Sequence, residues 1–97
     1  MTPQSLDDEV LARCADDFET SHTIAGDIAQ KLGRQISEEE VRAAVLSLAY
    51  NGLVQSYVFE ASLGSYLPIS AADAAKRETA SFMISAEGRK LHEIEAS

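Results

Sequence analysis

Apolar residues recur along the first half of the chain at the spacing of helices that bury one side. Three such segments lie at about residues 6–18, 24–32 and 38–51, and a few mainly polar residues separate each from the next. Because residues three or four apart share one face of a helix, each segment predicts a stripe directed into a core. The expected stripes are Val10, Cys14 and Phe18; Ile24, Ile28 and Leu32; and Val41, Val45 and Leu48.

Residues between these segments supply the start and stop signals of helices. Thr23 can cap the second helix, and Gly33 ends it as a left-handed C-terminal cap. After a brief turn, Ser37 begins the third helix, which Gly52 closes. Three helices with such tight connections are typical of a helix-turn-helix unit.

The pattern changes after the third helix. The run LVQSYVFEAS is rich in β-branched and aromatic residues and predicts a strand, and SYLPI and TASFMIS predict further short strands. Pro68 favours an edge position in the sheet, because proline cannot donate a hydrogen bond to a neighbouring strand. Between the last two strands, Ser70 and Asp73 could cap one helical turn, although an open loop fits the pattern equally well.

Ser85 then opens a last helix at about residues 86–95. The order of elements predicts an α+β fold with one small winged-helix domain over residues 1–97. That domain would comprise a three-helix helix-turn-helix core, a β-wing of two to three short strands at about residues 53–84, and the short C-terminal helix. The inward positions expected of the last helix are Leu91 and Ile94.

Three stretches of the chain carry a family resemblance: TIAGDIAQKLG, ISEEEVRAAVLSLAYNGLV and FMISAEGRKL. They resemble the corresponding signatures of bacterial winged helix-turn-helix transcription regulators of the MarR and PadR type. In those families a small residue follows the second-helix cap, the third helix ends at Gly-Leu-Val or Gly-Leu-Ile, and a serine or threonine with Glu-Gly opens the helix after the wing. The resemblance implies DNA contact through the third helix and the wing. The matching positions are Ala25; Gly52, Leu53 and Val54; and Ser85, Glu87 and Gly88.

Composition narrows the class of protein. A chain of 97 residues, 45% apolar and 25% charged, has the length and composition of one soluble domain. No apolar run reaches the roughly 18 residues of a membrane span, and the first residues lack the basic and apolar regions of a signal peptide. One cysteine cannot form an internal disulfide, in agreement with a reducing compartment. We therefore expect a cytoplasmic protein.

Net charge argues against unspecific binding of nucleic acid. Sixteen acids against eight bases give a formal charge of −8, whose summed field repels a polyanion at long range. The acids are unevenly distributed and crowd the first thirty residues, so a local basic patch elsewhere remains compatible with the composition. DNA binding, if it occurs, must overcome the field of the whole molecule.

Candidate chemistry is sparse. His22 and His92 are the only histidines, and neither has a partner at metal-ligand spacing. A minor alternative is a metal-sensing site that joins Asp16, Asp17 and Glu19 to His22. The glycines are scattered rather than gathered in a phosphate-binding loop, and no nucleophile has a visible base. We expect a non-enzymatic protein without cofactor or metal.

Three consecutive glutamates open the third helix. With Ser37 as cap, Glu40 falls at the third helical position of a capping box, and Glu38 and Glu39 adjoin the positive end of the helix dipole. The outward face of this helix offers only Arg42 to match bases in the major groove. Its apolar row either contacts a partner or packs on the first helix or the wing, and we weigh the two equally. The candidates for a protein interface are Glu39, Ala43, Leu46 and Tyr50.

A small set of residues remains for DNA contact. Lys31 and Arg34 flank the turn before the third helix, and Lys76 with Arg77 would form the tip of the wing, where an arginine can enter a minor groove. Helix starts can hold a phosphate through their N–H groups. The candidates are Thr23, Lys31, Arg34, Ser37, Arg42, Lys76 and Arg77.

Two functions follow from these observations. The first is a non-enzymatic winged-helix module that resembles transcription regulators and binds DNA. The alternative is an acidic winged-helix module that binds another protein or a second copy of itself and does not bind DNA. The resemblance favours the first function, whereas the charge of −8 favours the second.

Overall fold

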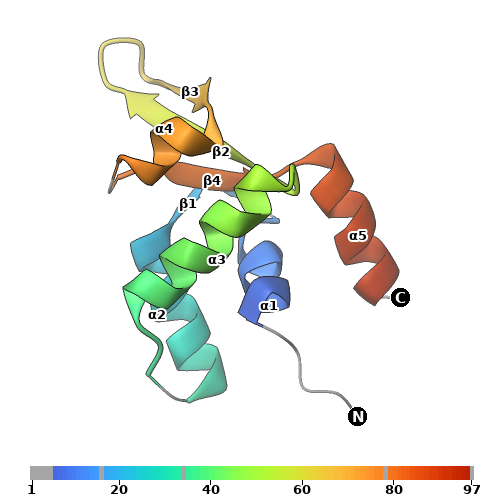
Figure 1. Cartoon of the computed structure of the whole chain (residues 1–97). Coiled ribbons are helices and arrows are strands. Elements are labelled where there is room, and N and C mark those ends of the chain that lie inside the picture. The colour runs from blue at the N-terminus through green and yellow to red at the C-terminus, as the bar shows by residue number, and fades with distance from the viewer. Residues whose placement is uncertain (1–5, 16, 34, 78, 97) are drawn as a thin grey trace.

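The computed structural model describes residues 6–15, 17–33, 35–77 and 79–96 of the chain (Figure 1). In these described residues, five helices and a four-stranded sheet give the α+β class that the sequence predicts. The helices are α1 (Leu6–Arg13), α2 (Ser21–Leu32), α3 (Glu38–Tyr50), α4 (Ala71–Ala75) and α5 (Ala86–Ala96). The strands are β1 (Glu19–Thr20), β2 (Val54–Glu60), β3 (Ser65–Ile69) and β4 (Ser81–Ile84).

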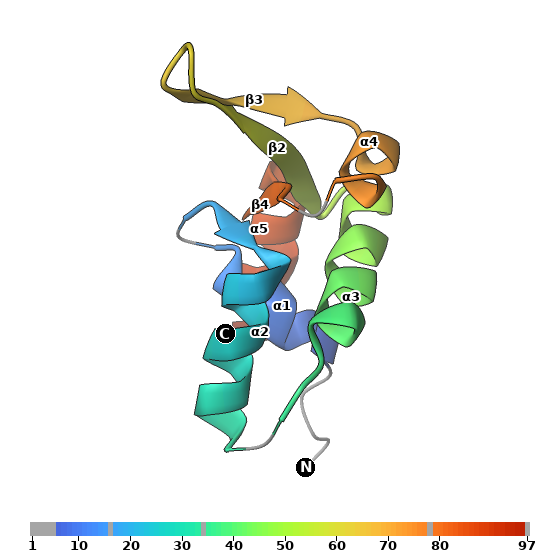
Figure 2. The ribbon, with the colours of Figure 1, turned by 90° about the vertical axis from the view of Figure 1, so that its left-hand side faces the viewer.

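The sheet is antiparallel with the strand order β1-β4-β2-β3. Within β2, only the first residues, from Val54 to Tyr57, pair with β4. The rest of β2 pairs with β3 alone, and this hairpin projects from the helical body (Figures 1 and 2). Pro68 lies in β3, the edge strand, as the sequence predicts.

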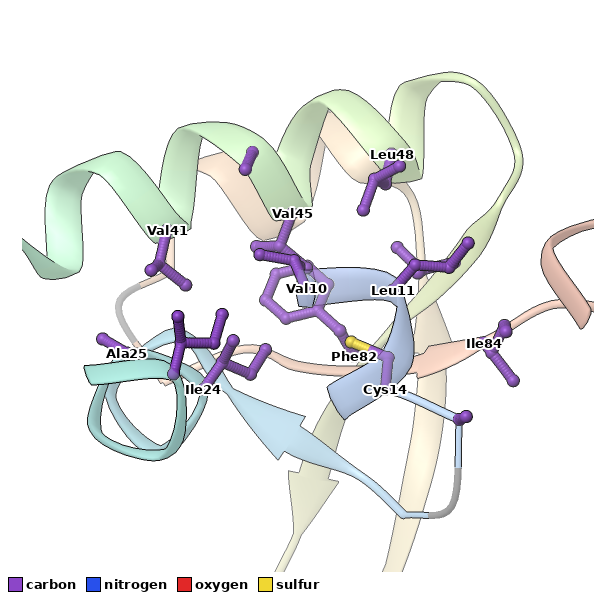
Figure 3. Close-up of a cluster of buried hydrophobic side chains, with 14 of the residues drawn as sticks. Val10, Leu11, Cys14, Ile24, Ala25, Val41, Val45, Leu48, Phe82 and Ile84 are labelled. Carbon is purple, nitrogen blue, oxygen red and sulfur yellow. The ribbon is translucent and has the colours of Figure 1, made fainter. Parts of the chain in front are cut away.

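The core lies between the sheet and the first three helices. Phe82 of β4 is completely buried and points into the middle of the cluster, between side chains of α1 and α3 (Figure 3). All three predicted residues of the third helix, and Val10 and Cys14 of the first stripe, are buried in this cluster. Phe82 is the largest fully buried side chain among the described residues, and its burial removes apolar surface from water.

The first helix is shorter than predicted. It ends at Arg13 instead of continuing to about residue 18. The Cys14 carbonyl, which would accept from the Phe18 N–H in a longer helix, instead accepts a 2.9 Å hydrogen bond from the Ile84 N–H of β4. The Phe18 N–H donates to its neighbour Asp17 at 2.7 Å. Pairing with β4 therefore ends the helix and removes Phe18 from the predicted stripe.

The second helix begins earlier than predicted, and its cap is Thr20 rather than Thr23. Thr20 has extended backbone and pairs with β4, so the helix starts at Ser21. The Thr20 hydroxyl accepts from the Thr23 N–H at 3.2 Å, and the Thr23 hydroxyl accepts from the Thr20 N–H at 3.1 Å. The two threonines form a reciprocal capping box. Gly33 ends the helix in the left-handed conformation with φ of 67°, as predicted.

Two positions predicted to be inward are at the surface. Leu32 in the last turn of α2 is 43% exposed, and Leu91 of α5 is 36% exposed. The side chain of Ile94 lies outside the described residues. Of the two alternatives left open after β3, the helical turn forms, with Ser70 accepting from the Asp73 N–H at 3.1 Å at the start of α4.

The loops that end α3 and begin α5 are joined to each other. The Ser85 hydroxyl donates to the Gly52 carbonyl at 2.6 Å, and the Ser85 N–H donates to the Leu53 carbonyl at 3.0 Å. The same hydroxyl accepts from the Gly88 N–H at 3.0 Å and so caps α5. A methyl group on Gly88 would overlap the Leu53 carbonyl oxygen. Glycine is therefore required where the start of α5 meets the end of α3.

Candidate functional site

The start of α3 presents the three glutamates to solvent. Ser37 accepts from the Glu40 N–H at 3.1 Å, as predicted for the cap. The Ser37 N–H makes no described hydrogen bond to the Glu40 carboxylate, so only the serine half of the predicted capping box forms. Glu38 lies 3.4 Å from Nδ1 of His22 on α2. A helix that entered a DNA groove at this end would bring these carboxylates towards phosphates.

Lys31 is engaged within the protein. Its Nζ lies 3.1 and 3.0 Å from the two carboxylate oxygens of Glu9 on α1. The Glu9 side chain is 3% exposed and that of Lys31 is 48% exposed, so the lysine reaches from solvent to a buried carboxylate. A buried carboxylate without its partner is strongly destabilising. The predicted DNA contact of Lys31 would have to break this pair.

Arg42 is also engaged, and its partner is the short helix α4. One guanidinium nitrogen donates to the carbonyls of Ala74 and Ala75 at 3.2 and 2.8 Å, and the other donates to the carbonyl of Arg77 at 3.1 Å. Ala74 and Ala75 are the last residues of α4, and Arg77 lies two residues beyond it, so Arg42 donates to carbonyls at the C-terminal end of this short helix. α4 packs beside α3 (Figure 2), and its Ala74 is fully buried. Arg42 therefore links α4 to α3, the helix whose outward face would contact bases.

The other predicted DNA contacts are not brought together. The Thr23 hydroxyl donates to the Glu19 carboxylate at 2.7 Å. Lys76 and Arg77, predicted at the tip of the wing, are exposed and lie between α4 and β4, away from the turn at residues 60–64 that ends the β2–β3 hairpin. Arg34 lies outside the described residues.

The predicted protein-interface row on α3 is not a continuous surface. Glu39, Ala43 and Tyr50 are exposed, whereas Leu46 is half-buried and packs against the core cluster. The sequence left open whether this row packs inside the protein or faces solvent. Leu46 packs, whereas Tyr50 is exposed. The row is therefore interrupted at its centre.

The β2–β3 hairpin exposes several apolar side chains that the sequence did not indicate as an interaction surface. Phe59 is 53% exposed, Leu63 is 64% exposed, and Tyr66 and Leu67 are each 38% exposed. The tip is a turn closed by hydrogen bonds from the Leu63 and Gly64 N–H groups to the carbonyls of Glu60 and Ala61. Exposed apolar side chains that gather in one place are characteristic of interaction sites.

Four aromatic rings lie together on one side of this hairpin, and we call them the aromatic face: Phe18, Tyr57, Phe59 and Tyr66. Phe18 stacks on Tyr66 with ring centroids 4.0 Å apart and meets Tyr57 edge-on at 4.8 Å. Phe59 pairs across the strands with Tyr66 at 5.2 Å. Strand alternation places this side opposite to the one that holds Ser56 and Phe82 in the sheet. The four rings therefore pack against one another on the side of the sheet opposite to Phe82.

A signal for this surface exists in the sequence. Tyr57, Val58 and Phe59 are consecutive, so apolar side chains occupy both sides of β2 instead of alternating with polar ones. Such a run predicts a strand covered on both faces. In the outer part of the hairpin this cover is incomplete, because Phe59 on one side is 53% exposed and Leu67 on the other is 38% exposed. Whether another element covers a strand is not visible in the sequence.

Chemistry at the remaining sites is limited. Burial raises the pKa of the Cys14 thiol from 9.0 to about 12, and the Glu19 carboxylate adds to the increase, so the thiol stays protonated and unreactive at neutral pH. The described residues contain no group of three His, Cys, Asp or Glu side chains placed to hold a metal ion. Asp16, part of the minor metal hypothesis, lies outside that set.

Comparisons with protein-family models, with curated proteins and with solved structures give no match for this chain. Within the described part of the chain, no helix is long and apolar enough to cross a membrane. The function is therefore inferred from the arrangement of the chain's own residues, of which the aromatic face and the engaged bases are the most distinctive.

Proposed function

We propose that this chain is a winged-helix module that binds another protein and does not read DNA. The winged-helix assignment draws support from the sheet order β1-β4-β2, in which the strand before α2 pairs with the last strand, and from the helices α2 and α3 between them. β3 and α4 then form an insertion between the two strands of the wing. The joined loops at Gly52, Ser85 and Gly88 coincide with the signatures that resemble MarR and PadR regulators.

Exposure of the hairpin carries the proposal. Phe59 and Leu63 keep more than half of their surface in water although the chain has a buried core into which apolar side chains pack. The hairpin, from Val54 to Ile69, contains one charged residue, Glu60. Depletion of charge with enrichment of aromatic residues is the compositional signature of the centre of a protein interface.

The arrangement of bases favours protein over DNA as the partner. Binding to DNA depends on lysine and arginine side chains that neutralise phosphates. Lys31 is paired with Glu9 and Arg42 with the carbonyls of α4, and α4 itself packs against the helix that would enter the major groove. Lys76 and Arg77 are the described candidates whose side chains are left for phosphates.

Fluorescence anisotropy with labelled random duplex DNA tests this proposal. We expect no binding at low salt, and no difference between the native chain and a variant in which Lys76→Glu and Arg77→Glu are combined. Binding that weakens steeply with added salt and disappears in the double variant would overturn the proposal. A photoreactive residue placed at Leu63 should form protein cross-links in cells that express the chain, whereas one at the exposed Gln30 of α2 should not.

A further inference from the structure

α4 and the residues that flank it bury little of their own side chains, and we call residues 70–77 the α4 cover. The cover packs beside α3 and β2 (Figure 2). Within it, only Ala74 is buried, and a single methyl group removes little apolar surface from water. A five-residue helix does not form in isolation. The position of α4 therefore depends on the hydrogen bonds that hold it to the body.

Arg42 of α3 supplies such hydrogen bonds. Its guanidinium donates to the carbonyls of Ala74 and Ala75 at 3.2 and 2.8 Å, and to that of Arg77 at 3.1 Å. A charged donor strengthens each bond, and the planar group fixes their directions. Loss of this one side chain would release the C-terminal end of the cover.

Arg42 also has acceptors close to it on its own helix. Glu38 and Glu39 precede it by four and three residues, the spacing at which side chains meet on the surface of a helix. An acid four residues before a base is the favourable orientation of such a pair. Both carboxylates are exposed, and together with Ser37 and Arg42 they line an open hollow. A guanidinium that left α4 would therefore find a new partner within one helical turn.

A buried hydroxyl on β2 favours movement of the cover. Ser56 is 2% exposed, and its Oγ has no hydrogen-bond partner among the described residues. It pairs with Ile69 of β3, one residue before Ser70 caps α4, and lies on the same side of the sheet as Phe82. A buried polar group without a partner costs free energy, which contact with water restores. Movement of α4 away from β2 would let water reach this hydroxyl.

We propose that the α4 cover is held closed by Arg42 and opens as a unit while the helical body stays folded. In the open position, Arg42 pairs with Glu38 or Glu39, and the base of β2 is uncovered. Ser56 shares its side of the sheet with the exposed Leu67, so opening extends the surface of the hairpin towards α3. This movement is a property of the chain alone, beyond the proposed function, and does not depend on what the hairpin binds.

Hydrogen exchange of the whole chain, in increasing urea below the unfolding transition, measures the opening. Three N–H groups of the cover donate to carbonyls within it: those of Ala74, Lys76 and Arg77. Because local opening exposes little surface, these groups should exchange quickly and almost independently of urea. The Ile84 N–H donates to the Cys14 carbonyl at 2.9 Å in the body and should exchange slowly, through unfolding that urea promotes.

Two arginine variants test how the cover is held. Arg42→Ala should speed exchange of the three N–H groups by about tenfold or more, the effect expected when hydrogen bonds from a charged donor are lost. Arg89→Ala is the matched control, because Arg89 also donates to a carbonyl, that of Ala15 at 2.9 Å, but lies on α5. It removes the same charge and should leave exchange in the cover unchanged.

Neutral substitution tests the glutamates. Glu38→Gln combined with Glu39→Gln weakens the acceptors that Arg42 uses in the open position, and should slow exchange in the cover by about twofold. Glu40→Gln combined with Glu93→Gln alters the net charge equally and should have no effect. Glu40 is two residues from Arg42 and does not face it, and Glu93 lies on α5.

A thiol at position 56 reports whether β2 is uncovered. Ser56→Cys replaces a buried hydroxyl by a thiol, and the native Cys14, also fully buried, is the internal reference for unfolding of the body. With a chromogenic disulfide reagent, the introduced thiol should react before Cys14 does. Adding Arg42→Ala should speed its reaction by about tenfold, in step with exchange in the cover.

Three results would each overturn the proposal. The first is exchange in the cover that is as slow and as dependent on urea as that of Ile84, because α4 would then open only when the body unfolds. The others are equal effects of Arg42→Ala and Arg89→Ala, and an introduced thiol that reacts no earlier than Cys14. An equal effect of the two glutamine pairs would overturn the change of partner by Arg42. All these results leave the proposed function intact, since DNA binding and cross-linking at Leu63 decide that separately.

Discussion

The helical body buries or pairs its apolar and charged side chains, whereas the β2–β3 hairpin leaves similar apolar side chains exposed. In the body, Phe82 is completely buried, Lys31 is paired with Glu9, and Arg42 donates to the carbonyls that end α4. In the hairpin, Phe59 is mainly exposed although nothing in its chemistry favours water. The body thus uses its apolar and charged groups for its own stability. The hairpin retains apolar groups that contribute little to folding, which is why we assign binding to it.

The largest effect expected from this comparison is a difference between two phenylalanines. Phe82→Ala should lower the free energy of unfolding by about 3–5 kcal/mol, because it empties the middle of the core. Phe59→Ala removes the same atoms from a largely exposed site and should cost under about 1 kcal/mol. Urea unfolding followed by circular dichroism measures both. Similar losses for the two variants would mean that the hairpin contributes to stability and would remove the contrast.

Two glycines of the helical body give the next largest effect. A methyl group at Gly88 would overlap the Leu53 carbonyl oxygen and lie 2.9 Å from Cγ1 of Ile84, so Gly88→Ala should destabilise the chain by about 3 kcal/mol. Gly26 lies inside α2 with nothing within 4 Å of such a methyl group. Gly26→Ala should stabilise by up to about 1 kcal/mol through helix propensity. Thermal unfolding compares the pair, and a tolerated Gly88→Ala would contradict the close approach of α5 to Leu53.

The last effect is a dependence of stability on pH, to which the buried thiol of Cys14 contributes. In the unfolded chain Cys14 ionises near its ordinary pKa of 9.0, whereas in the fold the pKa is about 12. Between these values the unfolded chain has lost a proton that the folded chain retains, so the thiol's contribution to stability is complete below pH 9 and falls as pH rises. The decrease is about 1 kcal/mol per pH unit.

Two variants isolate this contribution from other groups that titrate at high pH. Cys14→Ala removes it, and the difference in unfolding free energy between native chain and variant should narrow as pH rises from about 9 to about 11. Adding Ala61→Cys at the exposed hairpin tip to the Cys14→Ala variant should not restore the lost dependence of the unfolding free energy on pH. An exposed thiol ionises at the same pH in the folded and the unfolded chain. A restored slope would show that burial is not its cause.

Local signals in the sequence were sufficient to predict where α3 begins and where α2 ends. Ser37 and Gly33 act through hydrogen bonds and backbone conformation within a few residues, and both lie where the sequence predicts. The end of α1 was not predictable in this way, because it depends on a hydrogen bond between Cys14 and Ile84. The choice of Thr20 over Thr23 as cap likewise depends on pairing with β4.

The candidate site was less predictable than the fold, for the same physical reason. Whether Lys31 is available to a phosphate depends on Glu9, and whether Arg42 is available depends on carbonyls in α4. Both partners lie more than 20 residues away along the chain. Residue type indicates what a side chain can bind. The partner that it binds is decided by tertiary structure.

β4 has a consequence for how the chain folds during synthesis. Ser81–Ile84 follows α1, α2 and α3 along the chain and so leaves the ribosome after them, yet it supplies Phe82 to the core (Figure 3) and lies between β1 and β2. Until it emerges, α1, α2 and α3 surround an incomplete core whose apolar residues are open to water and to other nascent chains. Contacts between distant segments also slow folding relative to a simple helical bundle. We therefore expect the nascent chain to depend on chaperones until β4 has emerged.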